Sequence, residues 1–286
     1  MNSADFFCAF SSESVCLQHF KELRESQGIT CKFCGCKHHR WLEKRRSWEC
    51  RKCGLRIGIK SGTIMQFSKL SIMTWYHALY HIASTKKSMS AKELQRQLSM
   101  KRYEPVWYMR KKIQFAFRQQ NKQHLLKGRL SVESMMQSLF NTRSIGKKHC
   151  KQFEKRNQVM LIPEEIESIR RRGHPELMLL VATGIPLTDM EQRIIESSPY
   201  RTRFCYKRLT RFGGYHFKEQ KVRELPRGSW SEKVIHNAQR VLSGIHHLAQ
   251  KKYLQFVLDE FTYKYINRGS PDIFSEALVS LVKGRW

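Results

Sequence analysis

The chain has 286 residues, a formal net charge of +29 and nine cysteines. That length allows two or three domains, and no apolar run approaches the roughly 18 to 20 residues that a membrane-spanning helix needs. Lysine and arginine outnumber the acidic residues by 53 to 24. Such an excess favours a polyanionic partner, either nucleic acid or an anionic membrane surface. Because no lipidation signal or basic amphipathic anchor is present, we expect double-stranded DNA and no membrane; a merely basic soluble protein is the alternative.

Residues 1–28 are predicted to form a short pair of helices, in which "ESVCLQHFKELRESQG" ends at Gly28. The opening "MNSADFFCAF" lacks the basic and then apolar start of a signal peptide. With an odd number of cysteines, this favours a reducing compartment in which thiols bind metal rather than pair as disulfides. We therefore expect a cytoplasmic protein.

Two Cys-x-x-Cys pairs, "CKFCG" and "CRKCG", follow within residues 29–66. Their spacing matches the paired-knuckle zinc pattern, since each pair directs two thiolates at one point and two pairs complete a tetrahedron. The pattern predicts a zinc ribbon that holds one structural Zn²⁺, and free or disulfide-bonded cysteines are the alternative. Cys36, His38 and His39 are spare donors nearby, and "LRIGIKSGTIMQFSKLS" is predicted to form a small β-hairpin. The predicted ligands are Cys31, Cys34, Cys50 and Cys53.

Residues 67–120 contain three segments with helical spacing, "IMTWYHALYHIAS", "SMSAKELQRQL" and "EPVWYMRKKIQFAF". Ser90 precedes Glu93 by three residues, the capping-box pattern, and Pro105 suits the first turn of a helix. This series of helix starts and short turns is typical of a helix-turn-helix whose last helix, roughly 104–118, enters a DNA groove. An ordinary helical bundle with its cations in water is the alternative. The predicted DNA contacts are Lys101, Arg102, Arg110, Lys111 and Lys112.

Residues 125–280 are predicted to form a compact α/β domain, so that the chain as a whole belongs to the α+β multidomain class. Apolar runs typical of buried strands occur in "GRLSVESMMQSLF", "QVMLI" and "ELMLLVAT", with weaker ones in "RTRFCYKRL" and "GGYHFKEQKV". The segment from Lys233 to Arg268 is predicted to form two helices broken at Gly244.

Several of these segments together resemble a family of prokaryotic insertion-sequence transposases. The resemblance rests on "WECRKCG", "SGTIM", "LSIMTWYHALYHIASTKKSMSAKELQRQL", "NAQRVLSGIHH" and "KKYLQFVLDEFTYKYINR", and it covers about 15–120 and 230–280. It implies an N-terminal zinc ribbon, a helix-turn-helix and an RNase H-like nuclease core, in a prokaryotic protein at the nucleoid. Homodimers are a further implied possibility.

The chemistry that the resemblance implies is phosphoryl transfer with two divalent ions, Mg²⁺ or Mn²⁺, held by two Asp and a third Asn or Glu. The positions that match these ligands hold Glu133, Arg201 and Asn237. An arginine at the second position would repel a metal ion. Of the four aspartates, Asp5 precedes the zinc ribbon, Asp259 lies in a predicted helix and Asp272 in a terminal loop, which leaves Asp189. Glu133 with Asp189 or Glu191 could still assemble an unusual site.

Three hypotheses follow for function. The first, which we favour, is a transposase-derived, zinc-dependent DNA-binding protein with a degenerate core, acting as a regulator or an accessory factor. The second is an active insertion-sequence transposase with an unusual metal site, or a remnant of one under no selection. The third is a nucleic-acid-binding module without sequence preference, which salt dependence and specificity would separate from the first.

Overall fold

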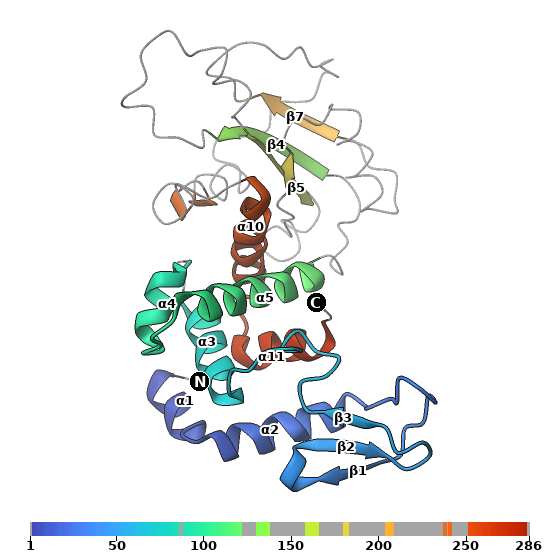
Figure 1. Ribbon diagram of the computed structural model, residues 1–286. Coiled ribbons are helices and arrows are strands. Elements are labelled where there is room, and N and C mark those ends of the chain that lie inside the picture. Colours follow the sequence, from blue (N-terminus) through green and yellow to red (C-terminus); the bar gives the residue numbers. More distant parts are fainter. Residues whose placement is uncertain are drawn as a thin grey trace. The chain divides into compact units, whose positions relative to one another are not determined.

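The computed structural model describes residues 2–85, 88–121, 130–137, 158–165, 180–182, 204–208, 237–238, 240–241 and 251–284 (Figure 1). The chain divides into two compact units. The first unit joins Met1–Gln119 to Gly269–Trp286, and the second is Gln120–Arg268. Helices and small sheets occur together, as the α+β prediction requires.

The first unit begins with the predicted helix pair, α1 (Ser3–Ala9) and α2 (Glu13–Ser26). The Ser12 side chain caps α2 by accepting a hydrogen bond from the Val15 N–H, which satisfies one of the donors left open at a helix start. Gly28, with φ of 80°, follows the end of the helix and turns the chain toward the first cysteine pair.

A three-stranded antiparallel sheet in the order β1-β2-β3 contains the region of the cysteine pairs. Its strands are β1 (His39–Leu42), β2 (Ser47–Cys50) and β3 (Arg56–Gly58), and the 3₁₀ turn η1 (Glu43–Arg45) joins the first two. The predicted hairpin beyond the second pair is therefore wrong after Gly58. Residues 59–67 form successive turns instead, because Gly62 and Phe67 adopt left-handed φ angles of 75° and 64° that interrupt a strand.

The three predicted helices of residues 67–120 are present as α3 (Ile72–Ser84), α4 (Ala91–Gln97) and α5 (Tyr103–Asn121). Ser71 caps α3 through the Thr74 N–H, and Ser90 caps α4 through the Glu93 N–H at 3.0 Å, as the capping-box pattern predicts. Pro105 lies in the first turn of α5, where a missing N–H costs nothing.

The C-terminal helix α11 (Ile273–Lys283) belongs to the first unit, whereas the sequence predicts that residues up to 280 belong to the core. Its buried apolar residues follow the spacing of one helical face: Phe274, Ala277, Leu278, Leu281 and Val282. The Phe274 ring lies among the aromatic side chains of α1 and α3, and the Leu281 carbonyl accepts a hydrogen bond from the Ile64 N–H at 3.0 Å. This apolar face, which no local pattern assigns to a partner, explains why the helix closes the first unit.

The second unit holds a four-stranded sheet in the order β6-β5-β4-β7. Its strands are β4 (Leu130–Gln137), β5 (Gln158–Glu165), β6 (Leu180–Ala182) and β7 (Phe204–Arg208). The first three form an antiparallel meander, and β7 runs parallel to β4. These strands match four of the predicted runs; the run "GGYHFKEQKV" and the break at Gly244 lie outside the described residues. Helix α10 (Lys251–Ile266) corresponds to the second of the two predicted late helices.

Candidate metal centre and nucleic-acid interface

The two cysteine pairs form loops with the same backbone geometry. In the first loop the Gly35 N–H donates to the Cys31 carbonyl at 3.0 Å, and in the second the Gly54 N–H donates to the Cys50 carbonyl at 2.9 Å. Both glycines adopt left-handed φ angles, 68° and 69°, which residues with a Cβ rarely adopt. The glycine after each pair therefore allows the loop to turn back and aim both of its thiols in one direction.

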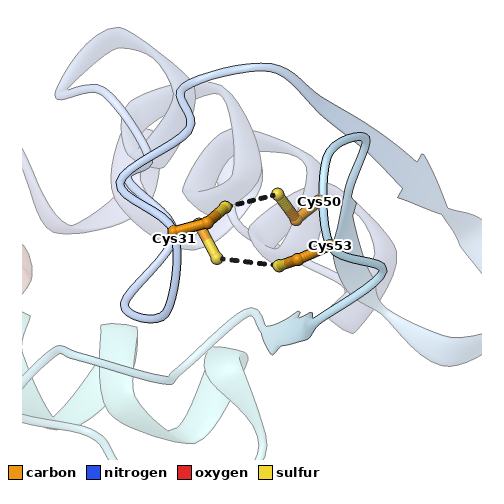
Figure 2. A group of neighbouring side chains, drawn as sticks. Cys31, Cys50 and Cys53 are labelled. Carbon is orange, nitrogen blue, oxygen red and sulfur yellow. Dashed lines mark hydrogen bonds between the residues drawn. The ribbon is translucent and has the colours of Figure 1, made fainter.

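Four sulfur atoms gather between these loops. Figure 2 shows side chains from the two loops pointing toward one another. The Sγ atoms of Cys31 and Cys53 are 3.5 Å apart, as are those of Cys34 and Cys50, and all four ligand atoms lie within 4.8 Å of one another. A tetrahedral zinc with Zn–S bonds of about 2.3 Å needs sulfurs about 3.8 Å apart. The cluster is therefore compatible with a structural zinc ion, as the sequence predicted.

The shifted pKa values of these thiols also favour a cation bound between them. The Cys53 backbone N–H lowers the pKa of Cys50 to about 6, and the Cys34 backbone N–H lowers the pKa of Cys31. The Cys36 N–H acts in the same direction on Cys34, but burial and hydrogen bonding to neighbouring sulfurs outweigh it and raise the pKa of Cys34 to about 12. Thiols this close cannot all ionise without a cation between them, and a bound metal ion provides one.

The spare donors named from the sequence do not join this cluster. The Cys36 sulfur contacts the His38 carbonyl at 3.7 Å, and the His39 Nδ1 atom lies 3.0 Å from the Lys37 carbonyl. Among the residues that the structure describes, the cysteine cluster is the only group of three or more His, Cys, Asp or Glu side chains that could hold a metal ion. Cys36, His38 and His39 therefore shape the loop after the first pair.

The sheet that carries the cysteines is fixed to helix α2. The Trp48 indole N–H donates to Glu25 at 3.0 Å, and the Trp48 ring is buried. Arg24 donates to the Ser61 carbonyl at 2.9 Å and lies over the Trp48 ring, with 5.6 Å from its guanidinium carbon to the ring centroid. Burial lowers the pKa of Arg24, which nevertheless stays charged near neutral pH. These contacts join the sheet beside the cysteine cluster to α2, within the same compact unit as helices α3 to α5.

A short turn joins α4 to α5, and one glutamine holds it in shape. The buried Gln95 side chain donates to the carbonyls of Met100 and Lys101, at 2.9 and 3.1 Å. Ser99 adopts a left-handed φ of 50°, the conformation that lets the chain reverse direction after a helix. Sequence reasoning missed Gln95, since nothing in the local pattern distinguishes a buried glutamine from a solvated one.

The predicted DNA-contacting cations fall into two groups. Lys101 and Arg102 are exposed at the start of α5. Arg110 and Lys111 are only 4% and 6% exposed, so α5 does not present them to solvent as the sequence suggested. Arg110 donates to the Ser88 hydroxyl. The apolar spacing of α5 predicts which side of the helix faces the core, but it does not predict that other segments also cover the turn with Arg110 and Lys111.

Lys112 has a structural role. Its ammonium group donates to the Gln66 carbonyl at 2.6 Å, and burial lowers its pKa. This bond attaches α5 to the turns that follow the cysteine sheet. Lys112 therefore contributes to the architecture of the first unit rather than to an open cationic face.

The three positions implied for a nuclease centre are only partly described. Glu133 lies in β4, in register with Ile162 of β5 and with Lys207 of β7. Asn237 lies in a helical residue pair and is exposed. Arg201, Asp189 and Glu191 lie outside the described residues. The residue beside Glu133 on the parallel strand is therefore Lys207, which sequence reasoning missed because strand register cannot be read from one strand alone.

No family model, curated protein or solved structure matches this chain. Among the described residues, none of the helices combines the length and the apolar character needed to cross a bilayer.

Proposed function

We propose that this chain is a zinc-stabilised protein that binds double-stranded DNA, derived from an insertion-sequence transposase, whose RNase H-like core does not cut DNA. In this proposal the first unit recognises DNA and the protein acts as a regulator or an accessory factor. The first unit supports the proposed DNA binding, and the β-sheet of the second unit supports the proposed origin and the inactivity of the core.

The observation that carries the DNA-binding proposal is the body formed by the cysteine cluster and helices α3 to α5. Helix-turn-helix proteins contact base edges with the N-terminal residues of their second helix. In α5 that end carries the exposed Lys101 and Arg102, together with Tyr103 and Tyr108, which are 40% and 60% exposed. Lysine and arginine side chains bind phosphates, and tyrosine side chains can contact base edges and sugars. Gln95 fixes the turn before them, so this end of the helix is pre-organised.

The second unit supports the transposase-derived origin through its strand order. An antiparallel meander of three strands, with a fourth strand parallel to the first, is the arrangement of an RNase H-like core, and β4 to β7 follow it. Metal-dependent strand cleavage needs acidic ligands on neighbouring strands. Here Glu133 stands in register with Lys207, and a cation at that position disfavours two divalent ions. This register supports an inactive core.

Fluorescence anisotropy with duplex DNA, followed across a salt series, tests the binding proposal. Lys101→Ala and Arg102→Ala should each weaken binding and reduce the slope of log K against log salt by about 0.9 per lost phosphate contact. Lys283→Ala, an exposed cation at the end of α11, is the matched control and should leave the slope unchanged. If the parent protein binds no duplex, or if all three variants behave alike, the interface lies elsewhere or does not exist.

A cleavage assay tests the active transposase as the alternative function. The protein, with Mg²⁺ or Mn²⁺ and the DNA that flanks its own gene, should yield neither nicks nor strand-transfer products. Products that disappear in Glu133→Ala would establish the active transposase and overturn the inactive reading.

A further inference from the structure

Two phenylalanine rings of the first unit project into solvent. Phe67 is 92% exposed and Phe33 is 82% exposed, although rings of this size usually bury most of their surface. Phe33 is the third residue of the first cysteine loop, and Phe67 ends the series of turns after β3. Single exposed apolar residues are common, so the backbone and the surroundings must decide whether these two have a function.

The backbone under Phe67 is held firmly in an unusual conformation. Phe67 has a φ of 64°, a left-handed angle that a residue with a bulky side chain seldom adopts. Its neighbours are fixed from several directions. Lys112 donates to the Gln66 carbonyl, Lys60 donates to the Ser68 carbonyl, and Trp75 donates to the Ser68 hydroxyl. The protein therefore maintains a strained turn whose outermost feature is an exposed ring.

The backbone under Phe33 is equally fixed, because the cysteine loop that carries it is closed by hydrogen bonds from the N–H groups of Cys31 and Gly35. The two loops are neighbours. The Cε atom of Lys32 lies 3.8 Å from the place where a Cβ on Gly62 would stand, and Gly62 belongs to the turns that lead to Phe67. The first cysteine loop therefore approaches the turns that end at Phe67, and each of these two segments carries one exposed ring.

Exposed lysines lie close to both phenylalanines in the sequence. Lys32 and Lys69 are exposed beside Phe33 and Phe67 in the chain, and the other exposed cations of the cysteine region include Lys37, Arg51 and Lys52. Exposed aromatic rings set among lysines and arginines are the elements with which proteins hold single-stranded nucleic acid, since the cations follow the phosphates and the rings stack on bases. The charge therefore favours nucleic acid over an apolar protein surface as the partner.

We infer that Phe33 and Phe67 stack on unpaired bases, so that the first unit binds DNA containing a gap, an open end or an unstacked step more tightly than it binds intact duplex. In a regular duplex each base face is covered by its neighbours, and a ring on a loop reaches a base face only where stacking is interrupted. This inference rests on the proposed DNA-binding function and specifies the form of DNA that the cysteine region contacts.

Anisotropy measurements with two DNAs of the same sequence, one intact and one with a short single-stranded gap, test the inference in the full-length protein. A 2-aminopurine base in the gap reports stacking through its fluorescence. The parent should prefer the gapped DNA. Phe33→Ala and Phe67→Leu should each weaken gapped binding by about tenfold and restore the 2-aminopurine signal, with affinity for intact duplex changed by less than about twofold.

Phe67→Tyr keeps a ring and should retain gapped binding, which separates stacking from general apolar contact. Val15→Ala, an exposed apolar residue on α2, is the control for loss of apolar surface. Zinc content and circular dichroism establish that each variant is folded.

Equal binding of both DNAs by the parent, with no effect of the phenylalanine variants, would overturn the inference and leave the proposed function intact. Absence of any DNA binding by the parent would overturn both. If Phe67→Leu instead converts a dimer to a monomer in sedimentation while gapped binding is unchanged, the ring serves a second copy of the chain and the inference is wrong.

Discussion

Replacing Phe274 with alanine tests whether the C-terminal helix completes the N-terminal unit. Phe274 is 3% exposed, and its ring centroid lies 4.9 Å from that of Phe6, 5.6 Å from Phe10 and 5.5 Å from Tyr76. Truncating a phenylalanine in such a core costs about 3 to 5 kcal/mol, against a total stability of about 5 to 15 kcal/mol for a domain. We therefore expect the variant to lose a large part of the stability of the first unit.

Hydrogen exchange followed by mass spectrometry measures this loss locally, since amide protection reports the stability of each element separately. In Phe274→Ala the amides of α1 and α3 should exchange much faster, although residues 3 to 84 are far from position 274 in the chain. Val279→Ala, a half-buried position on α11, is the matched control and should change protection only slightly. If α3 exchanges at the same rate in both variants, α11 does not stabilise the first unit and the assignment is refuted.

Two further predictions concern metal and pH. Cys53 is exposed, so Cys53→Ser removes a ligand without creating a cavity; metal analysis should show loss of stoichiometric zinc, whereas Cys8→Ser should retain it. Burial lowers the pKa of His19 and of His81, so the unfolded chain binds more protons and the unfolding free energy should fall as the pH drops below about 6.5. Urea titrations should show this fall lessened in His19→Gln, which can still hydrogen-bond the Tyr76 hydroxyl.

Local chemistry explains which features the sequence predicted correctly. The cysteine cluster depends on two short loops, each closed by its own glycine, and the spacing of four cysteines is sufficient to predict it. The helix starts depend on Ser12, Ser71 and Ser90, each of which caps a donor three residues along. These interactions lie within a few residues, so that one sequence contains all the information that specifies them.

Features that depend on partners far away in the chain were missed, because no short segment of the sequence contains both partners. The apolar face of α11 is visible in the sequence, but its partners on α3 and α1 lie about 200 and about 270 residues away. The register that sets Lys207 beside Glu133 depends on the pairing of β4 with β7, two strands that the sequence separates by about 66 residues. The burial of Arg110 and Lys111 likewise depends on what packs over α5. None of these can be read from residue spacing.

One carboxylate connects the cysteine region with the helices proposed to bind DNA. The Glu13 side chain accepts hydrogen bonds from the N–H groups of Ile72 and Met73, at 3.0 and 2.8 Å, where the helix dipole of α3 favours negative charge. The same carboxylate lies 3.8 Å from the guanidinium of Arg46, in the turn before β2. Glu13 on α2 therefore fixes the start of α3 relative to the cysteine sheet. Because Glu13 couples the cysteine region to the helices in this way, variants in the cysteine region and variants in α5 should have non-additive effects on DNA binding. Loss of the metal should also weaken the DNA contacts made by α5, although no metal ligand lies on that helix.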